Sequence, residues 1–270
     1  MTDSFENQVM EGHKVYAFET IDSTNLEAKR LAAKGASDGT VVTARAQTAG
    51  RGRRGRTWES PADANLYFTL LLRPQFAPDK ASMLTIVMAL AVAKGINLPR
   101  LGIKWPNDIW VDGRKVCGIL TELTLAHTAQ SSANTATNAG ANAYASIDNV
   151  IIGVGVNVER QEFPEELKAT AAALGEFGTT PTKQALLGAI LRQFDALYAQ
   201  FCAAGDLTPF LEEYRALSVN LGQCVRILDP KGEYEAIARD IAPTGELIVE
   251  LPGGATKRIY AGEVSLRPKK

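Results

Sequence analysis

The chain has 270 residues, of which 46% are apolar and 22% charged, and its formal net charge is -1. This length suits one large domain or two unequal ones, and the apolar content is sufficient for a well-filled core. The nearly balanced charge excludes a protein that is steered as a whole to nucleic acid or to a membrane surface.

Cysteine usage and the N-terminus indicate a cytoplasmic protein. Three cysteines stand far apart without metal-ligand spacing and are expected to be reduced thiols: Cys117, Cys202 and Cys224. The N-terminal residues are polar and acidic, unlike a signal peptide. The longest apolar run, residues 86–93, is too short to span a bilayer, so no membrane association is expected.

The first part of the chain predicts two strands around a short helix. Residues 14–19 alternate like a strand, and residues 24–35 read as a helix in which Thr24-x-x-Glu27 is a candidate capping box. Residues 40–46 are short and β-branched, as in a strand. Three polar residues then lie at the helix N-terminus, where capping alone would explain them: Ser23, Thr24 and Asn25.

Residues 47–60, called the Gly/Arg segment below, are rich in glycine and arginine. Three glycines allow close backbone approach, and four guanidinium groups lie between and beside them: Gly50, Gly52 and Gly55, with Arg51, Arg53, Arg54 and Arg56. Such a segment suits an anion such as a phosphate. Its glycine spacing also matches the dinucleotide fingerprint, but that site needs a helix directly afterwards, and Pro61 favours a loop. A solvated loop and a nucleic-acid patch are the plainer interpretations.

A buried helix separates the next strands. Residues 65–73 predict a strand, residues 79–94 are apolar nearly all round and predict a buried helix that Gly95 ends, and a short strand begins at Leu101. It leads into Lys104-Trp105-Pro106-Asn107-Asp108, in which the proline interrupts strand pairing.

The dipeptide at 112–113, Asp-Gly, predicts a two-residue hairpin turn. The register that follows pairs Val111 with Arg114, Trp110 with Lys115, and Asp108 with Cys117. Alternation puts Asp108, Trp110, Lys115 and Cys117 on one sheet face, where Asp108 and Lys115 are diagonal neighbours within reach of one another or of a shared ligand. For this pair alone, an ordinary cross-strand ion pair is the favoured interpretation.

The remaining chain predicts strands, an insertion and two helices. Residues 117–125 continue the hairpin strand, residues 126–146 read as a flexible inserted loop that contains His127, and residues 149–158 predict a buried strand. Residues 181–204 and 207–217 predict amphipathic helices. The apolar face of the first consists of Leu187, Ile190, Leu191, Phe194, Leu197, Tyr198 and Phe201.

From Val219 onwards short β runs alternate with Pro/Gly turns, which predicts a small barrel-like β domain. The expected strands cover residues 224–228, 235–241, 247–251, 257–260 and 264–266. No internal repeat is visible.

Five motifs occur in one order and spacing: Ser23-Thr24-Asn25; Gln47-x-x-Gly50-Arg51-Gly52-Arg53-x-Gly55-Arg56-x-Trp58; Lys104-Trp105-Pro106-Asn107-Asp108; Lys115-x-x-Gly118-Ile119-Leu120; and Gly153-x-Gly155-x-Asn157. Together they resemble the biotin protein ligases, and the C-terminal β segment resembles the small domain of that family. The resemblance implies an α+β fold, with a mixed or antiparallel sheet flanked by helices as in class II synthetases over residues 1–218. An SH3-like β-barrel is implied over residues 219–270.

The resemblance implies a two-step reaction. Biotin and Mg-ATP give biotinyl-5′-AMP and pyrophosphate, and a lysine of a biotin carboxyl carrier protein, as in acetyl-CoA carboxylase, then accepts the biotinyl group. The biotin carboxylate is itself the nucleophile, which agrees with the presence of only two histidines and no candidate triad. Positioning and cations supply this kind of catalysis, and no redox cofactor is implied.

The roles of individual residues follow from the resemblance. The implied biotin-binding residues are Ser23, Thr24, Asn25, Gln47, Gly50, Arg51, Gly52, Arg53, Lys115, Gly118, Gly153 and Gly155, with the hydroxyls and Gln47 at the ureido head and the last three glycines as the floor. The implied ATP-binding residues are Arg51, Arg53, Arg56, Trp58, Lys104, Asn107, Lys115 and Asn157, with Trp58 and Asn157 at the adenine. The implied catalytic residues are Arg53, Lys115, Lys104 and Asp108, and Asp108 is also the candidate ligand of Mg²⁺.

Some features depart from the family pattern. Cys117 stands where a smaller alanine is common, so a slightly tighter pocket floor is expected. Asp63 stands where many members have glycine. The inserted loop at 126–146 is longer than the usual connection. Some members carry an N-terminal DNA-binding domain, and because 22 residues precede Ser23, no specific DNA binding is expected.

Several alternatives stay open at this point. A related acyl-adenylating ligase for lipoate or another carboxylate is the nearest, although the Lys-Trp-Pro-Asn-Asp run and the dense Gly/Arg segment favour biotin. A nucleic-acid binder would use the arginines without turnover, with steep salt dependence. A nucleotide-binding oxidoreductase requires a helix after Gly55. Family members occur as monomers and dimers, so a homodimer also remains open.

Overall fold

The computed structural model describes residues 8–126, 146–229, 232–260 and 263–266. Nearly all of the predicted inserted loop, together with His127, lies outside these residues. No helix in the described ranges is long and apolar enough to cross a membrane.

The larger sheet has eight strands in the order β1-β2-β3-β4-β8-β7-β6-β5. Neighbouring strands are antiparallel except for β2 and β3, which are parallel because α1 connects them. The strands are β1 (Gln8–Met10), β2 (His13–Ile21), β3 (Thr40–Gln47), β4 (Asn65–Leu72), β5 (Leu101–Lys104), β6 (Asp108–Val111), β7 (Arg114–Leu125) and β8 (Ile147–Asn157).

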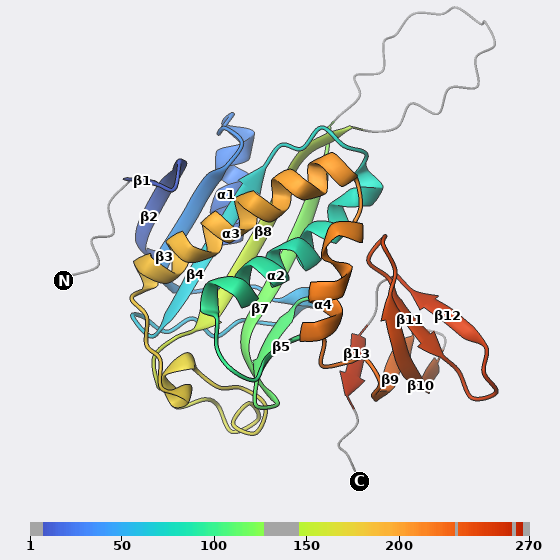
Figure 1. Cartoon of the computed structure of the whole chain (residues 1–270). Helices are drawn as coiled ribbons and strands as arrows, with labels where there is room; N and C mark the ends of the chain where they lie inside the picture. The colour runs from blue at the N-terminus through green and yellow to red at the C-terminus, as the bar shows by residue number, and fades with distance from the viewer. Residues whose placement is uncertain (1–7, 127–145, 230–231, 261–262, 267–270) are drawn as a thin grey trace, which may run out of the picture.

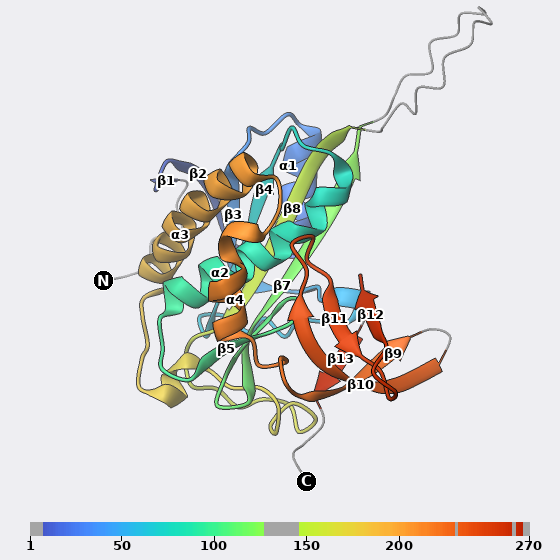
Figure 2. The ribbon, with the colours of Figure 1, turned by 45° about the vertical axis from the view of Figure 1, so that its right-hand side comes forward.

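Helices cover both faces of this sheet, as Figures 1 and 2 show. α2 (Leu84–Ile96) and α3 (Lys183–Ala204) lie on one face, and α1 (Thr24–Ala33) lies on the other. Successive side chains of a strand point to opposite faces. Val41 therefore belongs to the core under α2 and α3, whereas Val42 packs against α1.

The end of α2 corrects one prediction. Gly95 does not end the helix, which continues to Ile96 and is capped by Asn97 in the left-handed conformation. A Cβ atom at Gly95 would lie 2.8 Å from the side chain of Ile190 in α3. This glycine is therefore a point of close approach between two helices. The predicted apolar face of α3 is confirmed, since Ile190, Leu191 and Phe194 are fully buried.

The C-terminal part forms a five-stranded antiparallel sheet in the order β12-β11-β10-β9-β13. It follows α4 (Leu211–Leu217), and its strands are β9 (Cys224–Asp229), β10 (Gly232–Ile241), β11 (Leu247–Glu250), β12 (Thr256–Ile259) and β13 (Glu263–Leu266). The predicted fold class is confirmed. The division at residues 218 and 219 stays a prediction.

Two hydrogen bonds join this sheet region to the larger one through Trp105, whose side chain is almost fully buried. Its indole Nε1 donates to the carbonyl oxygen of Gly245 at 3.0 Å, and its backbone N–H donates to Oδ1 of Asn220 at 2.7 Å. The Lys-Trp-Pro-Asn-Asp turn is thus anchored from the C-terminal side.

Candidate active site

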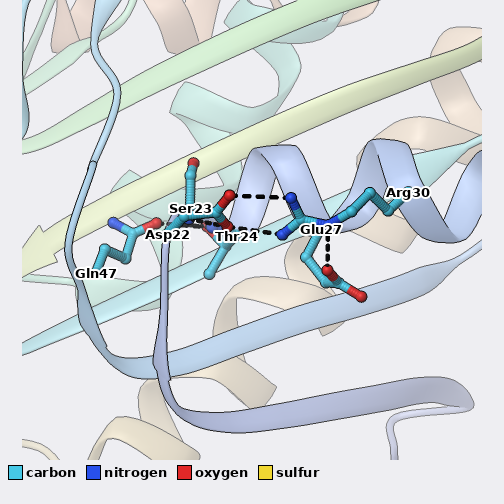
Figure 3. A network of polar contacts seen from close by, with 6 residues as sticks. All are labelled: Asp22, Ser23, Thr24, Glu27, Arg30 and Gln47. Carbon is cyan, nitrogen blue, oxygen red and sulfur yellow. Dashed lines mark hydrogen bonds and ion pairs between the residues drawn. The ribbon is translucent and has the colours of Figure 1, made fainter.

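The turn before α1 presents the buried hydroxyl groups of Ser23 and Thr24, and Arg30 holds the carboxylate of Asp22 in this turn (Figure 3). Ser23 is the N-cap residue but its side chain makes no capping hydrogen bond, and the predicted capping box at Thr24 is wrong because Thr24 is already helical. Arg30 instead donates to Asp22 at 2.7 and 2.9 Å and to Glu27 at 2.6 Å. The hydrogen bond from Arg30 lowers the pKa of Asp22 to about 2.

Gln47 links this turn to the Gly/Arg segment. Its Oε1 accepts hydrogen bonds from the backbone N–H and the hydroxyl of Thr24, at 2.8 and 3.1 Å, and its Nε2 donates to Ser60 at 2.9 Å. Ser60 in turn donates to the carbonyl oxygen of Trp58. A Cβ atom at Gly50 would lie 2.3 Å from that same carbonyl oxygen. Gly50 is therefore required for packing of the segment.

Three glycines form a flat surface on β7 and β8. A Cβ atom at Gly153 would lie 1.9 Å from Oδ1 of Asn25, so the amide of Asn25 rests directly on this strand. Cβ atoms at Gly118 and Gly155 would lie 2.9 and 2.5 Å from the indole of Trp58. Trp58 therefore lies across the glycine surface.

The Gly/Arg segment is a closed loop. Arg51 and Thr57 form an isolated antiparallel bridge, and residues Arg53–Gly55 form one 3₁₀ turn between them. Residues 56–64, all of them described, contain no helix. The segment therefore does not meet the structural requirement of a dinucleotide-binding site, in which a helix directly follows the glycines. At its tip, Nη1 of Arg53 donates to Oδ1 of Asn107 at 2.8 Å.

Lys115 and Asp108 form the expected pair, but through a different register. A bulge between Ile109 and Trp110 pairs Ile109 with Cys117 and Asp108 with Gly118. The predicted pairing of Asp108 with Cys117 is wrong, because one extra residue in β7 moves each later residue of that strand to the opposite face of the sheet from the one expected. Cys117 therefore lies in the core, where burial raises the pKa of its thiol, and Gly118 replaces it on the site face.

The ammonium group of Lys115 and the carboxylate of Asp108 lie in close contact. Nζ of Lys115 lies 2.7 Å from Oδ1 of Asp108, although the angle is not that of a hydrogen bond, and 5.3 Å from the ring centre of Trp58. The side chains of Lys115 and Asp108 are mostly buried, with 31% and 17% of their surfaces exposed, respectively. Lys115 thus stands between a carboxylate and an aromatic ring.

Two adjoining cavities contain the site. The inner one is lined by Ser23, Thr24, Asn25, Gln47, Arg51, Gly52, Arg53, Trp58, Asn107, Lys115, Gly118, Gly153 and Gly155, among others. The outer groove is also lined by Arg56, Lys104, Asp108 and Asn157. Arg53 and Lys115 line both. Every predicted site residue therefore lines one or both cavities, except Gly50, which packs behind them.

Comparison with known proteins places the chain in a family. The Biotin/lipoate A/B protein ligase family matches residues 17–136, and the Biotin protein ligase C terminal domain matches residues 221–267. A biotin–[acetyl-CoA-carboxylase] ligase of Paracoccus denitrificans is 34% identical over 242 residues, or 86% of this chain and 92% of that protein. A bifunctional ligase/repressor BirA of Bacillus spizizenii is 33% identical over 97% of this chain and 76% of that protein.

The chain belongs to the biotin protein ligase family.

A solved structure agrees with this assignment. The biotin protein ligase from Aquifex aeolicus in complex with biotin and ATP superposes with a TM-score of 0.75 at 28% identity, over 94% of this chain and 99% of that one. The match to the C-terminal domain of biotin protein ligases also favours biotin over the lipoate alternative.

Sequence reasoning missed several residues of this ligase site. Ser60 fixes Gln47, and Thr69 donates to Oδ1 of Asn25 at 2.8 Å. Glu122 accepts hydrogen bonds from Asn25 and Lys29. Alternation along β7 from Gly118 could have placed Glu122 on the site face, but its partners come from distant parts of the chain. Residues 161–164, which follow β8, form another wall of the outer groove.

Proposed function

We propose that the protein catalyses ATP-dependent biotinylation of the acceptor lysine of a biotin carboxyl carrier protein, through biotinyl-5′-AMP with release of pyrophosphate. One observation carries this function: five motifs scattered between residues 23 and 157 line two adjoining cavities. The inner cavity combines hydroxyl and amide groups with a flat glycine surface, and the outer groove combines cations with tryptophans. These surfaces suit a neutral polar bicyclic head group and a nucleotide, respectively.

The inner cavity suits the ureido head of biotin. The hydroxyls of Ser23 and Thr24 and the amide of Gln47 line it, and Gln47 is held in one orientation by Thr24 and Ser60. Such fixed donors and acceptors reject a ligand that lacks matching groups, because the buried groups would remain unpaired. Because Gly118 and Gly155 have no side chains, they would leave room for a ligand on the glycine surface that Trp58 covers.

Arg53 and Lys115, the two cations that line both cavities, are the proposed catalytic groups. In the first step an oxygen of the biotin carboxylate attacks the α-phosphorus of ATP, and the bond from that phosphorus to pyrophosphate breaks. Arg53 and Lys115 would reduce repulsion between the two anions and stabilise the charge that develops on the phosphorus oxygens. In the second step the lysine amine attacks the acyl carbon and AMP leaves.

The outer groove suits the nucleotide. Arg56, Lys104 and Asn157 line it, and Nζ of Lys104 lies 4.9 Å from the ring centre of Trp110. We assign Arg56 and Lys104 to phosphate oxygens and Asn157 to the adenine. Nδ2 of Asn157 already donates one hydrogen bond to the carbonyl of Ala172 at 3.1 Å. Its second N–H and its Oδ1 are therefore the groups assigned to the base.

Magnesium is proposed to enter with ATP. Mg²⁺ is commonly held by one or two carboxylates together with substrate phosphates. Asp108 fits a single ligand of this kind, since its carboxylate lines the groove, and the described residues contain no cluster of three or more His, Cys, Asp or Glu side chains that could form a complete cage. When bound, the ion would neutralise phosphate charge.

The class of the acceptor and the location of the protein are also proposed. The acceptor is a carrier of the acetyl-CoA carboxylase type, and a cytoplasmic location is expected.

Ligand-induced stabilisation tests the substrate class. Saturating biotin should raise the midpoint of thermal unfolding, whereas lipoate at the same concentration should not. Gly153→Ala should lose the response to biotin, because its methyl group would displace Asn25. A larger shift with lipoate than with biotin would contradict the proposal.

A further inference from the structure

Glu122 contacts three side chains, Asn25, Lys29 and Arg51, of which Asn25 and Arg51 line the inner cavity. It stands on β7, on the same face as the cavity residues Gly118 and Leu120. Only 19% of its side-chain surface is exposed. A carboxylate this deeply placed requires partners, because its desolvation is costly.

Its partners come from α1. Nδ2 of Asn25 donates to Oε2 of Glu122 at 2.9 Å, and Nζ of Lys29 lies 2.7 Å from Oε1. The other end of the Asn25 amide accepts a hydrogen bond from Thr69. Glu122 thus completes the fixation of the amide that rests on Gly153.

A third partner comes from the Gly/Arg segment. Nη1 of Arg51 lies 3.2 Å from Oε1 of Glu122 and 3.4 Å from Oε2. Burial acts to raise the pKa of Glu122, but the hydrogen bonds from Asn25 and Lys29 and the charges of Lys29 and Arg51 outweigh it, so the pKa is lowered. The group is an anion at neutral pH and attracts both cations.

We infer that Glu122 is a positioning residue that fixes Asn25 on the cavity floor and draws the Gly/Arg segment over the cavity through Arg51. Its consequence for catalysis depends on the proposed ligase function. A segment held in place shields a reactive mixed anhydride from water and places Arg53 near the reacting phosphate. Glu122 itself need not touch the substrate.

The first test needs no substrate. Glu122→Gln keeps an oxygen that can accept from Asn25 but removes the charge that attracts Arg51. Tryptic cleavage within residues 51–56 of the ligand-free protein should become about tenfold faster, equivalent to local opening that is easier by ~1.4 kcal/mol. Glu233→Gln, which removes an exposed partner of Arg226 in the C-terminal sheet, is the matched control and should leave this rate unchanged.

Lys29→Met separates the specific role from general stability. It removes an ion pair of the same carboxylate while leaving the contact with Arg51, so cleavage within the segment should not accelerate. If Glu122→Gln cleaves at the wild-type rate, or if both variants accelerate equally, the inference is wrong.

A kinetic measurement connects the segment to the reaction. With labelled biotin and ATP, Glu122→Gln should release about tenfold more biotinyl-AMP to solvent per carrier labelled, with a midpoint of thermal unfolding close to that of the wild type. An unchanged partition between release and transfer would overturn the kinetic role. If the wild type itself forms no biotinyl-AMP, the proposed function fails while the cleavage result still decides the inference.

Discussion

Arg53 is held by Asn107: its Nη1 donates a hydrogen bond of 2.8 Å to the Oδ1 of that residue. Asn107 is fixed in turn, since its Nδ2 donates to the carbonyl of Ile119 at 3.0 Å and its own carbonyl accepts from the N–H of Ile119 at 3.0 Å. Asn107 therefore joins the tip of the Gly/Arg segment to the turn between β5 and β6 and to β7 by hydrogen bonds. The side chain of Asn107 positions an arginine as well as lining the cavity.

A double-mutant cycle tests this coupling. Asn107→Ala should slow biotinyl-AMP formation by about tenfold or more because Arg53 loses its orientation, and Arg53→Gly should slow it further. If Asn107 acts through Arg53, the double variant should be no slower than Arg53→Gly alone. Pyrophosphate release in a single turnover measures all three variants. Fully additive losses would show that Asn107 has an independent role.

Lys115→Ala should weaken adenylate synthesis more than biotin binding. The ammonium group is assigned to charge that develops at the phosphate, and only interactions that strengthen in the transition state accelerate the step. The measurements are calorimetric titration with biotin and the rate of pyrophosphate release. A change confined to the free energy of unfolding would mean that the pair with Asp108 is an ordinary ion pair.

Gly153→Ala should destabilise the protein by about 1–3 kcal/mol, the usual range for overpacking. The added Cβ would lie 1.9 Å from Oδ1 of Asn25, which Thr69 and Glu122 hold from two sides. Gly188→Ala is the matched control, because its Cβ would meet only ordinary contacts, at 3.4 Å or more, with the side chains of Glu11 and Arg192. Gly188 lies in α3, where alanine is the better helix former. Urea unfolding compares them, and equal stability of the two variants would contradict the close contact at Gly153.

Trp105→Phe should weaken the attachment of the C-terminal sheet. It removes the hydrogen bond to the carbonyl of Gly245 and leaves that acceptor without its partner, at a cost of about 1–3 kcal/mol. Because the same turn carries Asn107, adenylation should also slow. Urea unfolding and pyrophosphate release test both effects, and wild-type stability would contradict the role assigned to the indole N–H.

His13 should make stability depend on pH near neutrality. The hydrogen bond to Asp195 in α3 raises its pKa above 6.5, with burial opposing and the bond to the carbonyl of Gly39 and the charge of Asp38 assisting. A raised pKa in the folded state means that the stabilisation is complete below pH 6.5 and is lost as the pH rises through the folded-state value. The difference in the free energy of unfolding between the wild type and Asp195→Asn should therefore shrink from pH 5.5 to 8.5. A difference that is constant or grows would contradict this linkage.

The sequence predicted most elements because their patterns are local. The apolar periodicity of α3 and the Asp-Gly turn at 112–113 needed no distant information. The face of Cys117 could not be predicted, since one bulged residue in β7 reverses the alternation that follows. The role of Gly95 also depended on a distant partner, Ile190.

The motifs predicted which residues line the site, but not what holds them. Ser60 and Glu122 carry no motif signal of their own, because their partners lie in other segments of the chain. Glu122, for example, meets Asn25 and Arg51 only after α1, β7 and the Gly/Arg segment have assembled. Such supporting contacts depend on tertiary packing, which cannot be read from a single sequence.

A transfer assay tests the central claim most directly. The protein is incubated with ATP, Mg²⁺ and labelled biotin, together with a biotin carboxyl carrier domain or its Lys→Arg variant at the acceptor position. Label should appear on the carrier lysine and be absent from the variant carrier. Pyrophosphate release without labelled carrier would indicate a different acceptor, and no turnover with biotin in either reaction would contradict the assignment as a biotin ligase.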